Sequence, residues 1–230
     1  MDTGVGKFYG PPPAKGFLKP RRTPANRRRR PRQSRALHTA RALQEAFVRL
    51  LVEKDYADVT IREIVALAGT GLGSFYEYFA SKQDLARVSL HLRTKSLLLA
   101  QHAAVTQHAG QPLDAIVDAV VAAQLAAHGG PPEEWTAHYL LERHQSDAAA
   151  YRKMYERFIG AWMGAFDAAG DLPPHFPRRE AAQVCQAILY GLFAHAYLSA
   201  SPAPDRALLA RQARTALHAY LGSVRGTLSD

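Results

Sequence analysis

The sequence predicts an all-α protein in which a small three-helix head precedes a larger helical body. Apolar residues recur every three or four positions in long stretches after residue 34, and no stretch alternates apolar and polar residues as a strand would. Two short helical patterns within residues 60–79 flank a glycine-containing turn. We therefore expect a tail at 1–33, the head at 34–81 and the body at 82–230.

The excess positive charge of the chain lies in the tail. The net charge is +9, and residues 1–33 hold ten of the 29 Lys and Arg residues but one of the 20 Asp and Glu residues. The rest of the chain is therefore neutral. Prolines and glycines with few aliphatic residues predict that this tail is disordered.

The sequence predicts neither secretion nor a membrane span. It shows no basic, apolar leader and no apolar run near 18 residues. Its single cysteine, Cys185, excludes an intrachain disulfide and fits a reducing cytoplasm. We expect a cytoplasmic protein in which Cys185 is a small buried residue of a helix.

The centre of the head has the pattern of two helices joined by a tight turn. Thr60 and Glu63 have the spacing of a capping box, in which each side chain binds the amide of the other residue. Gly69 can adopt the left-handed conformation that ends such a helix. A second helix is expected from about residue 71 to 79.

This second helix is expected to face the core with Phe75 and Phe79, which lie four residues apart. Ser81 and Asp84 repeat the capping-box spacing and predict the start of a third, longer helix. Helix, turn and helix in this order form a helix-turn-helix, whose second helix enters the major groove of DNA.

Residues 68–85 read Ala-Gly-Thr-Gly-Leu-Gly-Ser-Phe-Tyr-Glu-Tyr-Phe-Ala-Ser-Lys-Gln-Asp-Leu. This run resembles the one usual in the tetracycline-repressor (TetR) family of bacterial regulators, Ala-Gly-Val-Ser-x-Gly-Thr-x-Tyr-x-His-Phe-x-Ser-Lys-x-x-Leu. The resemblance is specific over about residues 35–85, and beyond them it concerns size and helical character. It implies a DNA-binding head and a body that dimerises and binds a small molecule.

The expected DNA contacts fall into three groups. Phosphate contacts are expected, from position and from the resemblance, at Thr60, Tyr76, Tyr78 and Lys82. Base edges are expected to meet the start of the second helix at Thr70, Leu72, Gly73 and Ser74. Two interpretations stay open for the tail residues Arg27, Arg28, Arg29 and Arg30. They form an arm that follows the DNA backbone or enters the minor groove, or they belong to a solvated segment that attracts DNA only weakly.

Three further positions affect how the second helix is expected to recognise DNA. Glu77 can accept from a cytosine amino group or form an ion pair within the head. Gly71 replaces the usual serine N-cap, at a cost of about a few tenths of a kcal/mol. Leu72 replaces an often polar residue and leaves contact with a thymine methyl. We therefore expect recognition to rest on few base contacts, on DNA shape and on the tail.

The remaining helices follow from their apolar spacing and their caps. The first helix of the head is expected from Ser34, as its N-cap, to about Lys54. The body helices are expected at about 82–107, 112–128, 133–144, 147–166, 180–200 and 206–224. Asp171 to Arg178, with three prolines, is expected to be the longest interior loop.

The resemblance implies a small-molecule pocket among the middle helices of the body. The candidate pocket residues are Trp135, His138, Tyr139, Glu142, Phe158 and Trp162. We expect the aromatic residues to form the walls of the pocket and either His138 or Glu142 to act as its polar anchor. Ordinary core packing is the alternative for each of these residues. The sequence identifies no cofactor and leaves the small-molecule effector unknown.

The last two helices are expected to form a homodimer interface. The first has an apolar stripe of Val184, Ala187, Ile188, Gly191, Leu192 and His195. The second has one of Leu208, Ala213, Leu217, Tyr220 and Leu221. The resemblance implies that both stripes pair with their two-fold copies, and core packing within the chain is the alternative. Two reading helices about 34–36 Å apart would recognise a palindrome.

No catalytic or metal-binding pattern accompanies these features. The ten histidines lack zinc-ligand spacing, and no nucleophile elbow or Walker lysine occurs. The sequence therefore predicts a cytoplasmic, nucleoid-associated, ligand-responsive DNA-binding regulator without enzymatic activity, a repressor that releases a palindromic operator when a small molecule binds. The alternative is a nucleoid-type structural DNA-binding protein that depends on the basic tail.

Overall fold

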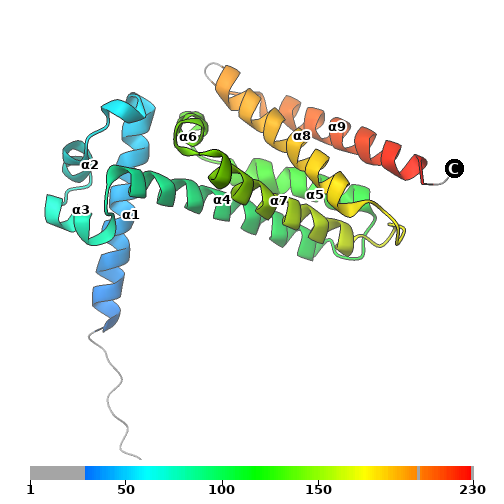
Figure 1. Cartoon of the computed structure of the whole chain (residues 1–230), viewed down its shortest axis with the longest axis horizontal. Helices are drawn as coiled ribbons and strands as arrows, with labels where there is room; N and C mark the ends of the chain where they lie inside the picture. Colours follow the sequence, from blue (N-terminus) through cyan, green and yellow to red (C-terminus); the bar gives the residue numbers. More distant parts are fainter. Residues whose placement is uncertain (1–28, 201–202, 229–230) are drawn as a thin grey trace, which may run out of the picture. The chain divides into compact units, whose positions relative to one another are not determined.

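The computed structural model describes residues 29–200 and 203–228, and within them the side chains from Ala36 onward. These residues form α-helices and one 3-10 helix, and no strand occurs among them (Figure 1). The prediction of an all-α fold is therefore confirmed for this part of the chain. The predictions for Arg27 to Arg30 concern side chains that lie outside the described residues.

The chain divides into two compact units, residues 1–37 and 38–230. Helix α1 (Arg29–Glu53) begins five residues before Ser34, so the prediction of Ser34 as its N-cap is wrong. Pro31 is compatible with the first turn because the amides there have no acceptor within the helix. The predicted boundary near residue 81 falls inside the second unit and stays a prediction.

The short helices of the head follow α1. They are a 3-10 helix η1 (Tyr56–Asp58), α2 (Ile61–Leu67) and α3 (Leu72–Tyr78). Their common core contains the completely buried side chains of Leu43, Phe47, Ile64, Phe75 and Leu85. The body contributes to this core through Leu85, from the helix at 82–107, and through Leu141, from the helix at 132–145. The head therefore packs against two body helices.

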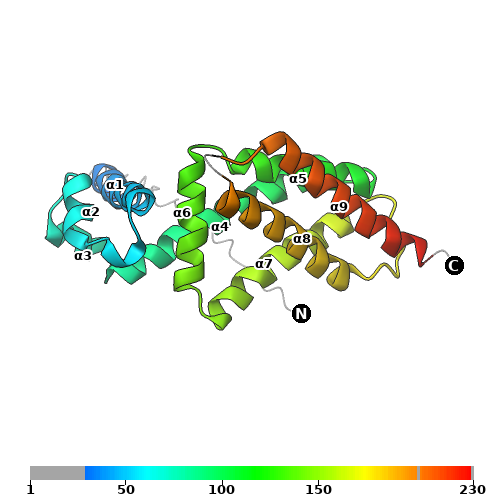
Figure 2. The same ribbon diagram turned by 90° about the horizontal axis from the view of Figure 1, so that it is seen from above.

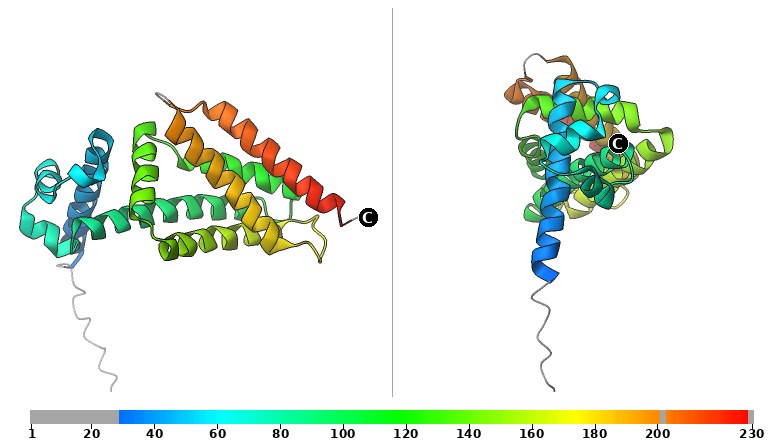
Figure 3. Two further views of the ribbon diagram at one scale, coloured as in Figure 1. Left: turned by 45° about the horizontal axis from the view of Figure 1, so that its top comes forward. Right: turned by 90° about the vertical axis from the view of Figure 1, so that its left-hand side faces the viewer.

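Within its described residues, the body contains six long helices (Figure 1): α4 (Lys82–Gln107), α5 (Leu113–Ala127), α6 (Pro132–Gln145), α7 (Ala148–Ala168), α8 (Arg178–Ser199) and α9 (Arg206–Gly226). Helix α4 packs against α5, α6 and α7, and α8 packs against α6, α7 and α9. Figures 2 and 3 show α8 and α9 running side by side. All six helices lie within about three residues of their predicted bounds.

The apolar stripe of α9 belongs to the core of the chain. Ala213, Leu217 and Leu221 are completely buried against the other helices of the body. The expectation that these three residues pair with a second copy is therefore wrong. Helix α9 must turn its apolar stripe inward because α5 and α8 both pack against it.

Two further expectations concern single features of the described chain. Cys185 is completely buried on α8, as predicted, and burial raises the pKa of its thiol to about 12. Among the described helices, none combines the length and the apolar character that crossing a membrane would require.

Candidate functional site

The start of α2 is fixed by the predicted capping box. The Glu63 amide donates to the Thr60 hydroxyl at 3.3 Å, and the Thr60 amide donates to the Glu63 carboxylate at 2.9 Å. Lys54 forms an ion pair with the same carboxylate. The Thr60 hydroxyl also donates to this carboxylate, at 2.7 Å. The ion pair with Lys54 and the hydrogen bonds from the Thr60 hydroxyl and amide lower the pKa of Glu63 to about 2. The Thr60 side chain is therefore already occupied, and its predicted phosphate contact stays a prediction.

The turn between α2 and α3 is a Schellman motif. Gly69 has a φ of 65°, as predicted. The Gly69 amide donates to the Ala66 carbonyl at 3.2 Å, and the Thr70 amide donates to the Val65 carbonyl at 2.9 Å. These two bonds satisfy the last carbonyls of α2 and set the direction in which α3 begins.

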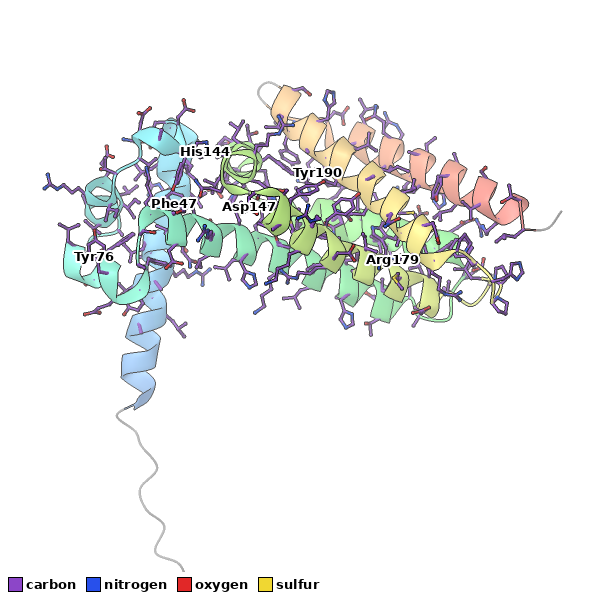
Figure 4. The ribbon with its side chains drawn as sticks, viewed as in Figure 1. Phe47, Tyr76, His144, Asp147, Arg179 and Tyr190 are labelled. Carbon is purple, nitrogen blue, oxygen red and sulfur yellow. The ribbon has the colours of Figure 1, made fainter. Side chains whose placement is uncertain are left out.

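Helix α3 has a buried side and an exposed side. Phe75 and Phe79 are 0% and 4% exposed, as predicted. Leu72 and Tyr76 are 43% and 59% exposed, and Figure 4 shows Tyr76 on α3 in the head. Gly73 and Glu77 are also exposed, whereas Ser74 and Tyr78 are half-buried. The exposed side therefore offers mainly apolar, aromatic and backbone groups to a binding partner.

Two of the predicted DNA contacts have side chains that are turned inward. The Thr70 hydroxyl is buried and has no hydrogen-bond partner among the described residues. The Lys82 ammonium donates to the carbonyls of Tyr56, Ala57 and Val59 at 2.8, 3.2 and 2.6 Å. Partial burial lowers the pKa of Lys82. Since its three N–H donors hold the segment around η1, a phosphate would have to replace a carbonyl.

The middle of the body contains a small cavity of about 30 Å³. Its lining comes from α4, α5, α6, α7 and α8 and comprises Arg93, Thr94, Leu97, Gln124, His128, Tyr139, Met154, Phe158, Gln186, Leu189, Tyr190 and Phe193. A volume of this size accommodates about one or two water molecules. A larger ligand would require the surrounding side chains to move.

The six predicted pocket residues lie at four different places. Tyr139 and Phe158 line the central cavity. Trp135 and His138 line a second, more open pocket of about 490 Å³ beside α1 and α4. Trp162 is completely buried in the apolar core and lines none of these pockets, so its predicted role as a pocket wall is not supported by its position.

Glu142, the sixth of these residues, forms a buried salt bridge with Arg93. The two side chains are 4% and 6% exposed, and the second carboxylate oxygen accepts from the Tyr190 hydroxyl at 3.1 Å. The Arg93 guanidinium also lies 4.8 Å from the ring centre of Tyr139. Figure 4 shows Tyr190 on α8. Glu142 thus has internal partners at both oxygens.

Two histidines near the cavity are uncharged at neutral pH. His128 contacts the Gln124 carbonyl through Nδ1 at 2.7 Å and the Tyr139 hydroxyl through Nε2 at 3.0 Å. Burial lowers the pKa of His128 to about 3 and that of His138 to about 4. The neutral His128 ring can donate through one nitrogen and accept through the other, which matches its two partners.

Comparison with known proteins bears on the head. Residues 43–88 match the family model described as bacterial regulatory proteins, tetR family. This range contains the capping box, the Schellman turn and the whole of α3. Residues 43–88 thus form the helix-turn-helix region of a TetR-family transcriptional regulator. Its helix-turn-helix is therefore a DNA-binding element.

Relatives of this TetR-family regulator differ widely in sequence. It is 23% identical over 145 residues to the uncharacterized HTH-type transcriptional regulator YxbF of Bacillus subtilis, in a match that covers 55% of this chain and 38% of that protein. The chain thus spans well under half the length of this curated relative.

Two solved structures share the fold of this regulator. One is from Mesorhizobium loti and is assigned to the TetR family of transcriptional regulators (TM-score 0.65, 16% identity, 82% of this chain and 98% of the other covered). The other is assigned as a transcriptional regulator of Pseudomonas aeruginosa (TM-score 0.64, 18% identity, 85% and 92% covered). At these identities the similarity shows that the fold is shared.

Sequence reasoning on this TetR-family regulator missed the polar residues of the cavity. Arg93 on α4, Gln124 on α5 and Gln186 on α8 are 9%, 4% and 4% exposed. Each lies in the buried stripe of its helix, among residues such as Leu97 and Leu189. One signal in the sequence could have identified these three residues. Each is a polar residue at a position where the helical period predicts an apolar one.

Helix α8 of this regulator has an exposed side of small and apolar residues. Val184, Ala187 and Gly191 are exposed, as is His195, whereas Ile188 and Leu192 are half-buried. On α9, Leu208 is 42% exposed. The predicted α8 stripe thus remains accessible in the single chain at Val184, Ala187, Gly191 and His195, whereas the α9 stripe is buried at Ala213, Leu217 and Leu221.

Proposed function

We propose that this TetR-family regulator is a homodimeric repressor that binds a palindromic operator through α3. In this proposal, a small molecule that occupies the central cavity lowers the affinity for the operator. The proposal rests on one observation above all, that α4 belongs both to the head core and to the cavity.

Helix α4 directly connects the core of the head with the central cavity. Lys82 at its first turn binds carbonyls of the head, and Leu85 is completely buried in the head core. Arg93, Thr94 and Leu97 of the same helix line the cavity. At 1.5 Å per residue, Arg93 lies about 16 Å along the helix from Lys82. A ligand that shifts Arg93 would therefore shift the anchor of α3.

Helix α6 provides a second connection that the sequence did not reveal. Leu141 belongs to the head core, and the next residue, Glu142, forms the buried salt bridge with Arg93. Tyr139 of the same helix lines the cavity. On this helix, too, His144 contacts the Tyr56 ring with ring centres 5.1 Å apart. Expansion of the cavity would therefore act on the head through two helices.

The exposed side of α8 is the proposed dimer surface. Its small residues, Ala187 and Gly191, permit close approach of a second helix, and exposed apolar side chains favour burial. A two-fold dimer would present two copies of α3 to successive major grooves.

The proposal is tested by fluorescence-anisotropy titration at physiological salt. The fragment upstream of the protein's own gene is compared with a scrambled duplex of equal length. We expect a preference of about 10³-fold or more for the specific fragment. Leu72→Ala should weaken binding to this fragment, whereas Leu99→Ala, which removes an exposed leucine from α4, should not.

Deletion of residues 1–28, which leaves α1 intact, separates this proposal from the structural DNA-binding alternative. A protein that reads sequence through α3 should keep its preference and lose part of its affinity and salt dependence. Loss of all binding after the deletion, or equal binding to both duplexes before it, would contradict the proposal and favour the alternative.

A further inference from the structure

The surroundings of the central cavity are electrically neutral. Arg93 is the charged residue among those that line the cavity, and its charge is balanced by the buried carboxylate of Glu142. His128 is neutral because burial lowers its pKa, and the pKa of Tyr139 is raised by burial. A charged ligand would therefore lose its hydration without gaining a free counter-charge.

Most polar groups of the lining already have partners within the chain. The Thr94 hydroxyl donates to the Leu90 carbonyl at 2.9 Å, and the Gln124 amide donates to the Leu97 carbonyl at 3.1 Å. His128, Tyr139 and Tyr190 also have the partners described above.

Arg93 and Gln186 are the exceptions. Among the described residues, no group accepts from Nε or Nη1 of Arg93, and none donates to Oε1 of Gln186. Both side chains are at least nine-tenths buried. Buried polar atoms without partners are costly, so a ligand that pairs with them gains the free energy that the empty fold lacks.

We propose that the cavity takes an uncharged, flat aromatic molecule with a carboxamide-like edge that accepts from Arg93 and donates to Gln186. This inference rests on the proposed function for the role of the cavity as the effector site. Phe158, Phe193 and Tyr139 supply apolar faces for the ring. A carboxylate ligand would instead share Arg93 with Glu142 and bring two like charges together in a dry site.

Met154 is the side chain through which the cavity would open. It lines the cavity and also an open pocket of about 720 Å³ between α4 and α7, and Arg93 and Thr94 belong to both. The methionine side chain is unbranched and adapts easily to a new shape. Its displacement would join the two spaces and make room for a ring.

The test uses three probes of nearly equal shape, which are neutral benzamide, anionic benzoate and cationic benzamidinium. Binding to the full chain is measured by ligand-detected NMR titration, in the millimolar range expected for such small probes. We expect benzamide to bind at least about tenfold more tightly than either ion. Met154→Ala should strengthen benzamide binding.

Gln186→Met tests the polar edge, since it keeps the volume and removes the unpaired oxygen. It should weaken benzamide binding about fivefold to tenfold and leave toluene binding unchanged. Gln183→Met is the control on the same helix, because Gln183 is an exposed glutamine of α8 that does not line the cavity. It should affect neither probe.

Three results would overturn the inference. They are binding of an ion as tight as that of benzamide, equal effects of Gln186→Met on benzamide and toluene, and no benzamide binding to wild type or Met154→Ala. Failure of the proposed function is distinguishable, because benzamide would then bind as described while no ligand of this class released the operator.

Discussion

The Arg93 guanidinium of α4 and the Glu142 carboxylate of α6 form a salt bridge that is almost completely withdrawn from solvent. Tyr190 of α8 donates to the same carboxylate, so the pair joins three helices at the edge of the central cavity. Removing both charges from water is costly, and each charge is tolerated because the other is present. The two residues should therefore behave as a unit.

A double-mutant cycle tests this dependence. Glu142→Leu leaves the Arg93 charge buried and unpaired, and we expect it to lower the free energy of unfolding by about 3–5 kcal/mol. Arg93→Met combined with Glu142→Leu should recover most of this loss, as measured by urea denaturation. Additive effects of the two substitutions would show that the pair is not coupled.

His128 should make stability depend on pH. Its pKa is about 3 in the folded protein and near 6.5 when unperturbed, so the unfolded chain binds more protons between these values. Stability from this group is fully present above pH 6.5 and is lost as the pH falls. Between pH 7 and pH 5 the loss is about 2 kcal/mol.

The readout for His128 is the difference between wild type and His128→Asn in urea denaturation at the two pH values. The variant has no ring to protonate, so its stability should fall less on acidification, even if it is less stable at both pH values. Equal losses in the two proteins would contradict the assignment of a depressed pKa to His128.

Gly69 and Gly73 should respond in opposite ways to alanine. Gly69 has a φ of 65°, so Gly69→Ala forces a Cβ into a left-handed conformation and should destabilise the fold by about 1–2 kcal/mol. Gly73 lies in α3 with ordinary φ and no atom within 4 Å of an added Cβ. Gly73→Ala should therefore stabilise α3 by about 0.5–1 kcal/mol.

Thermal unfolding measures both glycine effects, and operator binding adds a second readout for Gly73. If the α3 backbone approaches DNA closely, Gly73→Ala should bind the operator less tightly although it is more stable. A Gly73→Ala protein that is both more stable and equally tight in binding would remove Gly73 from the DNA contacts.

The elements of this fold could be predicted because their signals are local. The Thr60 and Glu63 capping box, the left-handed Gly69 and the side-chain caps of α4 and α7 all act within a few residues of sequence. The end of α1 near Lys54 follows in the same way. Its start at Arg29 was missed because a favourable N-cap at Ser34 does not oblige a helix to begin there.

The cavity could be predicted only in part because it depends on contacts between distant helices. Aromatic residues such as Trp162 look alike in a core and in a pocket wall, and packing decides between the two. Arg93 was overlooked because its partner Glu142 lies 49 residues away along the chain. For the same reason, the apolar stripes of α8 and α9 could not be divided between core and surface from spacing alone.

The exposed side of α8 yields a final prediction about assembly. Ala187 is exposed in the single chain and lies at the centre of the proposed dimer surface. Ala187→Arg should place a charge from each subunit in the proposed interface and shift the protein to monomers in sedimentation velocity, because burying these unpaired charges is costly. Operator affinity should fall with the loss of the dimer, since one α3 contacts only half of a palindrome.

Ala122→Arg, at an exposed alanine of α5, is the control and should stay dimeric. If Ala187→Arg remained dimeric, the α8 surface would not be the interface, and the spacing of the two copies of α3 would have to be set elsewhere.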